Sequence, residues 1–330
     1  MSTTSGIALV ATHEFRIRLR TGRWRWLLGS WVVVVGVFTV LMRLSLSEID
    51  ENRPYGVPMF GCLMLFVLAL AMIVSPTLTA QSINGDRERG TLATLQVTRL
   101  TPTQIALGKL LAAWSVGVAA LLLTLPFVVW CLIEGGINPL AVLAVFGVVA
   151  VLIGVVCAVS QAISALLARS ITSALLSYVV MFALTVGTVI VFSLATALSA
   201  EQHTPGGDIG SYRQERPDHV WWLLAPNPFV VLADATPQLD PTYDRRTGEY
   251  RPHPFDPLGE LGRGIRELRE DPNTRRDYDD YEGGRRHDSA GRVWPTGLAV
   301  DLILGAGAVL ITIRRLRIPS RALPKGVRVA

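Results

Sequence analysis

The sequence predicts an all-α membrane protein with six transmembrane helices. Half of the 330 residues are hydrophobic and the mean hydropathy is +0.41, which is too apolar for a soluble domain. Several uncharged stretches reach the length of about 20 residues that a helix needs to cross a bilayer. Helices are the expected spanning element because an open sheet edge cannot satisfy its backbone groups in lipid.

Residues 1–26 are expected to form a cytoplasmic helix that lies on the membrane surface. Its five clustered arginines face a single acid, Glu14, while Trp24 and Trp26 suit the headgroup zone. The alternation over residues 15–20 also fits a short strand, but an isolated strand has no partner at a bilayer. Binding of nucleic acid is the less favoured interpretation of these arginines.

The first five spans are expected within residues 27–198 and the sixth at residues 295–313. Pro76 and Pro126 predict kinks in the second and third spans, because proline cannot donate to the helix ladder. The first apolar run is longer than a signal peptide usually carries and lacks a small-residue cleavage site, so we expect an uncleaved anchor. The expected spans are residues 27–44, 58–80, 105–133, 140–167, 171–198 and 295–313.

The charge pattern predicts that both termini lie in the cytoplasm of a plasma-membrane protein. With the N-terminus inside, the basic segments all fall on the cytoplasmic side, including Arg169 and the tail of residues 314–330. The short outer loops then contain only Arg43 and Arg53 as cations. An odd number of spans would place the basic tail outside.

Residues 199–294 are expected to form a long extracytoplasmic loop. This region holds 18 of the 26 acidic residues of the chain, so the basic balance elsewhere reflects membrane topology. Within it, residues 220–235 are apolar, aromatic and interrupted by two prolines, which fits an interfacial or re-entrant segment. Residues 237–292 are rich in Pro, Gly and charge, so we expect them to be poorly ordered.

No catalytic, metal or cofactor site is expected in this chain. The sequence lacks the G-x-x-x-x-G-K-[ST] phosphate loop, so ATP hydrolysis on this chain is not expected. It also lacks H-E-x-x-H, G-x-S-x-G and C-x-x-C motifs. The three cysteines lie in apolar runs, and the histidines of the outer loop are better explained as solvated than as metal ligands, namely His203, His219, His253 and His287.

The connector between the second and third spans, residues 81–104, is the candidate functional segment. It predicts a short helix that begins near Asp86, with Ile83, Leu92 and Leu95 on its apolar face. Thr101-Pro102 ends this run, and a new helix is expected from Gln104 onward. An ordinary solvated loop between two spans is the alternative interpretation.

The connector resembles the cytoplasmic segment of ABC-2 type transporter permeases. The motifs that carry the resemblance are D-R-E-R-G-T-L at residues 86–92, R-L-T-P at 99–102 and G-K-L at 108–110. The spans also fall where that family has them. The resemblance implies a coupling helix that docks on a separate ATPase subunit, formed by Asp86, Arg87, Glu88, Arg89, Gly90, Thr91, Leu92 and Leu95.

The same resemblance implies an exporter with two permease subunits, a homodimer or a heterodimer, and two separate ATPase subunits. Gln161 and Asp301 are the candidate pathway residues, because polar side chains within spans are costly and face partners or cavities. The alternatives are a hydrogen bond from Gln161 to a neighbouring helix, which is the commoner use of such residues, and an interfacial position for Asp301 near the outer end of its span. An ion-coupled secondary transporter and a membrane scaffold or sensor remain as alternatives. In the genome, an adjacent reading frame with ATPase motifs would favour the hypothesis of an ABC transporter permease.

Overall fold

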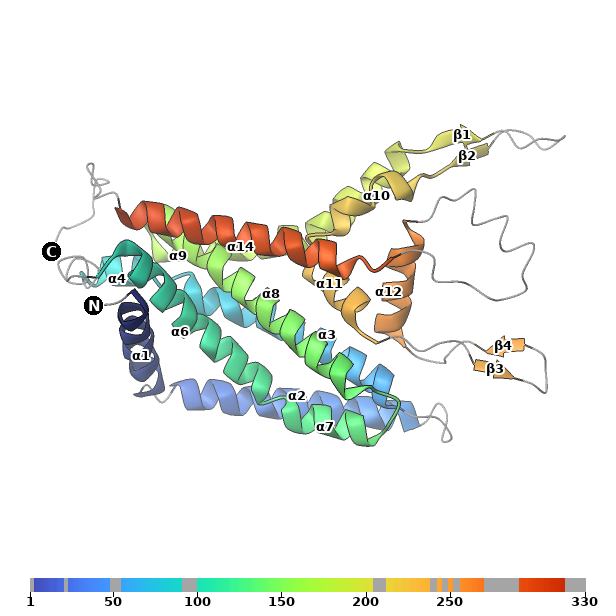
Figure 1. Ribbon diagram of the computed structural model, residues 1–330, viewed down its shortest axis with the longest axis horizontal. Helices are drawn as coiled ribbons and strands as arrows, with labels where there is room; N and C mark the ends of the chain where they lie inside the picture. The colour runs from blue at the N-terminus through green and yellow to red at the C-terminus, as the bar shows by residue number, and fades with distance from the viewer. Residues whose placement is uncertain are drawn as a thin grey trace.

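A computed structural model describes residues 3–20, 23–47, 55–90, 100–203, 212–237, 242–244, 249–251, 256–269 and 291–317. Within these residues, six helical segments are long and apolar enough to cross a membrane. They run side by side as one bundle (Figure 1). The prediction of an all-α membrane protein with six spans is therefore confirmed. The six segments are Trp26–Ser47, Gly56–Glu88, Pro102–Ile133, Pro139–Leu166, Ser170–Leu198 and Trp294–Arg317.

The helices of the first half of the chain are α1 (Thr3–Arg20), α2 (Arg23–Ser47), α3 (Gly56–Thr79), α4 (Asn84–Glu88), α6 (Pro102–Leu122) and α7 (Leu125–Ile133). Those of the second half are α8 (Pro139–Leu166), α9 (Ser170–Phe182), α10 (Thr188–Leu198), α11 (Pro228–Ala235), α12 (Pro257–Glu267) and α14 (Trp294–Arg317). α3 runs through Pro76, whereas the third span divides before Pro126 into α6 and α7.

Two short antiparallel hairpins accompany the helices. Strand β1 (Glu201–His203) pairs with β2 (Tyr212–Gln214), and β3 (Thr242–Asp244) pairs with β4 (Glu249–Arg251). In the register of the first hairpin Gln202 lies opposite Arg213. Both hairpins lie beyond the bundle end that carries α12 (Figure 1), so they leave the helical architecture unchanged.

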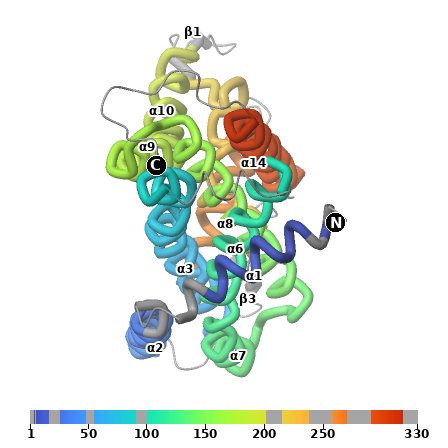
Figure 2. The backbone as a smooth tube through the Cα atoms, turned by 90° about the vertical axis from the view of Figure 1, so that its left-hand side faces the viewer, coloured from blue at the N-terminus to red at the C-terminus, as the bar shows by residue number. Residues whose placement is uncertain are grey.

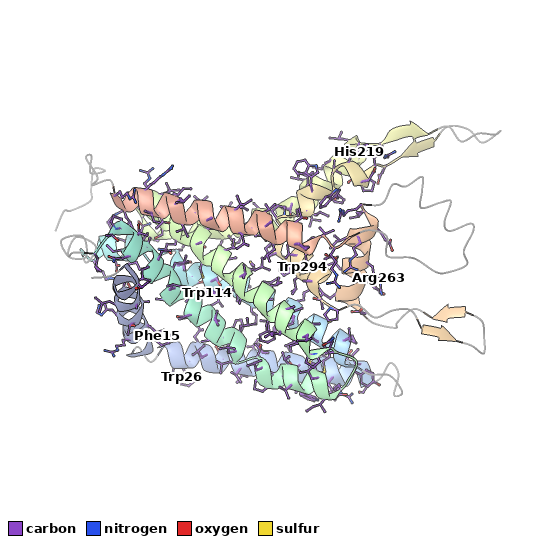
Figure 3. All side chains as sticks on the ribbon, in the orientation of Figure 1. Phe15, Trp26, Trp114, His219, Arg263 and Trp294 are labelled. Carbon is purple, nitrogen blue, oxygen red and sulfur yellow. The ribbon has the colours of Figure 1, made fainter. Side chains whose placement is uncertain are left out.

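α1 crosses the opposite end of the bundle and packs against α6 (Figures 1 and 2). The close approach depends on Gly108, where an added Cβ would lie 2.6 Å from the Cβ of Val10. The helical conformation of α1 decides against the short strand that the alternation over residues 15–20 also allowed. Figure 3 shows Phe15 on this transverse helix.

The core of the bundle lies where α3, α6 and α8 meet. Phe60, Met64 and Leu152 are buried there. Trp114 of α6 donates its indole N–H to the carbonyl oxygen of Ala150 at 2.7 Å, which joins α6 to α8 (Figure 3). The outward faces of α2, α9 and α10 expose large apolar side chains, as expected of helices that face lipid.

The fifth span changes its helical repeat in the middle, because α9 and α10 are joined by a π-helical segment at Ala183–Gly187. Such segments leave backbone carbonyls without a partner in the helix. Asn227 supplies that partner, since its amide group donates to the Thr185 carbonyl at 2.7 Å and to the Thr188 hydroxyl at 2.9 Å. Its side-chain oxygen accepts from the Phe229 N–H and caps α11. Asn227 therefore fixes α11 to the fifth span.

α11 is buried against α3, α8 and α14, and α12 lies over it and over the end of α3. The structure thus places the second half of residues 220–235 inside the protein. The expectation of little order over 237–292 is wrong for the part that forms α12. In α12, Leu258, Gly262 and Ile265 recur at helical spacing on one buried face. Because α12 has only 11 residues, its amphipathic pattern hardly changes the average composition of residues 237–292, which is polar, and the composition therefore did not predict the helix.

Candidate functional site

α4 lies at the bundle end that also holds α1 and the last turn of α14 (Figure 1). The predicted helix near Asp86 is present, but it begins at Asn84 and ends at Glu88. Ile83, one of the predicted apolar residues, is fully buried and packs with Ile105 and with residues of α8 and α14. Its side chain therefore anchors α4 to the bundle.

A buried lysine joins α4 to two other helices. The ammonium group of Lys109, on α6, is 2% exposed and contacts the carboxylates of Glu14 on α1 and Asp86 on α4. The second oxygen of Asp86 accepts from Arg89 at 3.1 Å. We refer to Glu14, Asp86, Arg89 and Lys109 as the Lys109 cluster. Its two positive and two negative groups balance, as burial of charge requires.

Polar contacts attach α4 to the turn between α8 and α9. Arg87 donates to the Leu167 carbonyl at 3.1 Å, and Glu88 accepts from the Ser170 N–H at 3.0 Å. The hydroxyl oxygen of Ser164 accepts from the backbone N–H groups of Ile83 and Asn84. α4 thus contacts the α8–α9 connection directly, in addition to α1 and α6.

Two features end α4 and restart the chain as α6. Gly90 has a φ of 74°, a left-handed conformation that favours glycine and stops a helix. Thr101 caps α6 reciprocally with Gln104, and Pro102 occupies the first turn. α6 therefore begins two residues before the predicted restart. The predicted coupling residues Thr91, Leu92 and Leu95 lie outside the described residues.

The remaining predicted coupling residues differ in their surroundings. Asp86 is held inside the Lys109 cluster, and Arg87 and Glu88 are engaged by backbone groups of the α8–α9 turn. The Arg89 side chain is 67% exposed. Of the four charged residues in the predicted motif, Glu88 and Arg89 are exposed, whereas Asp86 is buried and Arg87 is half-buried.

The structure does not bring the two candidate pathway residues into one site. The Gln161 amide donates to the Ala106 carbonyl at 2.9 Å, so it joins α8 to α6 as a helix-to-helix hydrogen bond. Asp301 is 2% exposed on the buried face of α14, between Gly297 and Gly305. Among the described residues its Oδ2 has no hydrogen-bond partner.

Sequence reasoning did not select Lys109 or Glu14 as site residues, although these two form an ion pair in the Lys109 cluster. Lys109 was quoted only as part of the G-K-L motif, and Glu14 only as the single acid among the N-terminal arginines. Each of these charges could have been recognised from the sequence as one that needs a partner, because Lys109 lies in an apolar run and Glu14 lies among arginines. Their pairing across 95 positions required the packing of α1 on α6.

The geometry defines a class of protein: a polytopic helical membrane protein whose transverse helix and charged connector meet at one end of the bundle. The family description "ABC-2 family transporter protein" matches residues 8–258, which is more than half of the 330 residues. The chain belongs to this family. The match includes the Lys109 cluster and ends at the beginning of α12. No curated protein matches the chain.

Proposed function

We propose that the protein is the permease subunit of an ABC exporter, powered by separate ATPase subunits that dock on α4 and the residues after it. The export direction follows the tendency of the family. A second permease subunit, a copy of this chain or a homologue, would complete the transport path. ATP hydrolysis would take place on the partner, because this sequence has no phosphate loop.

The observation that carries this proposal is the way α4 is attached. Lys109 ties it to α1 and α6, and Glu88 ties it to the first turn of α9. A displacement of α4 by an ATPase would therefore be passed to several spans through buried contacts. A solvated loop would not need a buried lysine with two carboxylate partners, which is costly unless the geometry is maintained.

The position of charges supports a cytoplasmic location for the end that carries α4. The helix α1, the start of α9 and the last turn of α14 lie at that end (Figure 1), and they carry Arg16, Arg169 and the last-turn arginines of α14. At the other end Arg43 is paired with Glu134 at 2.7 Å, which removes its net contribution. On the positive-inside rule, we propose that α1 and the end of α14 lie in the cytoplasm of a plasma-membrane protein.

Thiol labelling tests this orientation. In a variant without the three native cysteines, single cysteines at Ser47 and Asn138 should react with a membrane-impermeant reagent applied to intact cells. Cysteines at Gln81 and Arg169 should react only after the membrane is opened, because they lie at the end that carries α4. Labelling of Gln81→Cys in intact cells would reverse the proposed orientation.

Docking of an ATPase is tested at the predicted apolar anchors Leu92 and Leu95. Leu92→Ala combined with Leu95→Ala should greatly reduce recovery of the ATPase in a pull-down, since truncating a buried interface anchor costs about 2 kcal/mol or more. Arg89→Ala is the matched control, because an exposed charge at the rim costs less than about 1 kcal/mol and its effect depends on salt. Both variants must reach the membrane in equal amounts.

Equal ATPase recovery with the leucine variant would contradict docking at these residues. If the wild-type chain recovers no ATPase, an ion-coupled transporter becomes the better hypothesis. The buried carboxylate of Asp301 is the observation that favours this second candidate. A membrane scaffold would show neither ATPase recovery nor any dependence of transport on an ion gradient.

A further inference from the structure

We propose that α12 is a lid over the outer end of the bundle, held shut by an ion pair between Asp234 and Arg266. Its outer location rests on the orientation proposed above. α12 lies across the bundle end, close to the start of α14 (Figure 1). It lies almost entirely beyond the range that matches the family, so a role for it must be argued from its own contacts.

The lid rests on a small apolar footprint. Leu258 is 1% exposed and sits on Gly61 of α3, where an added Cβ would lie 3.2 Å from the Leu258 Cβ. Ile265, two turns later, is also buried, while Glu260 and Leu261 on the other side of α12 are exposed. The absence of a side chain at Gly61 lets α12 approach α3 closely. Few apolar side chains would have to be uncovered if α12 lifted.

The polar part of the contact is centred on Asp234 at the end of α11. Its carboxylate is fully buried and accepts from the Arg266 Nε at 2.6 Å through one oxygen. The other oxygen accepts from the backbone N–H groups of Val293 and Trp294, at 2.6 and 2.7 Å. One side chain thus joins α11, α12 and the first turn of α14. Figure 3 shows Arg263 of α12 and Trp294 of α14 in this region.

The loss of Arg266 and the loss of the backbone N–H groups would have different consequences for the Asp234 carboxylate. If Arg266 moved away, the carboxylate would keep two backbone hydrogen bonds and the positive end of α14. The Arg266 side chain is 10% exposed, so a small part of it already reaches the protein surface, whereas the Asp234 side chain is fully buried. Release of Arg266 therefore avoids stranding an unpaired buried charge, which is the usual penalty for breaking a buried ion pair. This asymmetry fits a latch that opens.

Labelling of a thiol at position 258 tests the latch in the full chain. Leu258→Cys is placed in the cysteine-free background (Cys62→Ala, Cys131→Ala, Cys157→Ala) and exposed to an impermeant maleimide in intact cells. Addition of Arg266→Gln should accelerate labelling about tenfold or more, because hydrogen bonds to charged groups change an opening equilibrium by roughly that factor. Arg263→Gln, which removes the same charge from the same helix, should change the rate less than about twofold.

Equal labelling rates with and without Arg266→Gln would overturn the latch, as would equal acceleration by Arg266→Gln and Arg263→Gln. If Arg266→Gln fails to accumulate in the membrane, Arg266→Lys keeps the charge but loses the planar guanidinium, and it should accelerate labelling by a smaller factor. A rate unchanged by Arg266→Lys would then overturn the latch.

Opening during turnover is tested with ATP in membranes that also hold the ATPase. The wild-type latch should then show faster labelling of Leu258→Cys than in the absence of nucleotide. If the complex hydrolyses ATP while labelling stays constant, the lid takes no part in transport, although the permease function stands. If no ATPase is recovered, the permease proposal fails, and the Arg266 comparison still decides whether the latch exists.

Discussion

Replacing Lys109 by methionine is expected to cost about 3–5 kcal/mol of folding free energy, because it removes the cation shared by two partly buried carboxylates and leaves Asp86 with Arg89 alone. The loss should free α1 from α4 and α6. We expect a lower denaturation temperature for the purified protein and faster tryptic cleavage at Arg16 of α1. Recovery of the ATPase should fall as well if α4 is the docking element.

Two variants serve as controls for the Lys109 experiment. Arg314→Met removes an exposed charge at the same bundle end and should leave the denaturation temperature nearly unchanged. Neutralising the partners as well, with Glu14→Gln, Asp86→Asn and Lys109→Met together, should restore much of the stability, since replacing a buried ion group completely is often neutral. An unaltered denaturation temperature in the single Lys109 variant would show that the cluster does not hold the three helices together.

Asp234→Ala is expected to destabilise the other end of the bundle by a similar amount, about 3–5 kcal/mol. The substitution leaves the Val293 and Trp294 N–H groups without their carboxylate acceptor and removes the ion-pair partner of Arg266. The expected result is a denaturation temperature lowered by about 6 °C or more, together with faster amide exchange in the first turn of α14. Both can be measured on the detergent-purified chain.

A graded series separates the charge of Asp234 from its hydrogen bonds. Asp234→Asn keeps one side-chain oxygen as an acceptor and should lie between wild type and alanine. Combining Asp234→Asn with Arg266→Met also removes the cation that has lost its partner and should recover part of the loss. If alanine and asparagine at position 234 behave alike and both remain close to wild type, the carboxylate does not organise this end of the protein.

The membrane spans could be predicted from the sequence because a bilayer imposes a length and a composition on each one. The fourth span was expected at residues 140–167 and is the helix Pro139–Leu166. The third was expected as one helix with a kink at Pro126 and is divided just before that residue. Here the fixed φ and missing N–H of proline act locally, so a local rule located the break.

The candidate site could be predicted only in part. The motif at residues 86–92 located α4, since its charges, the following glycine and the later Thr101-Pro102 are all local signals. The contacts that each side chain makes could not be predicted from neighbouring residues in the sequence. Glu88 was expected in the coupling helix, and only the structure shows that its carboxylate accepts the Ser170 N–H, 82 positions away. Gln161 was a pathway candidate, and its amide joins two helices.

By itself, the sequence determined that this chain crosses a membrane six times and carries a charged connector between its second and third spans, because apolar length and charge act segment by segment. The tertiary structure alone decided which charges meet. Lys109 finds Glu14 only when α1 lies on α6, and Asp234 finds Arg266 only when α12 folds back over α11. A buried charge is stable only beside its partner, and the identity of that partner is a property of packing between distant segments.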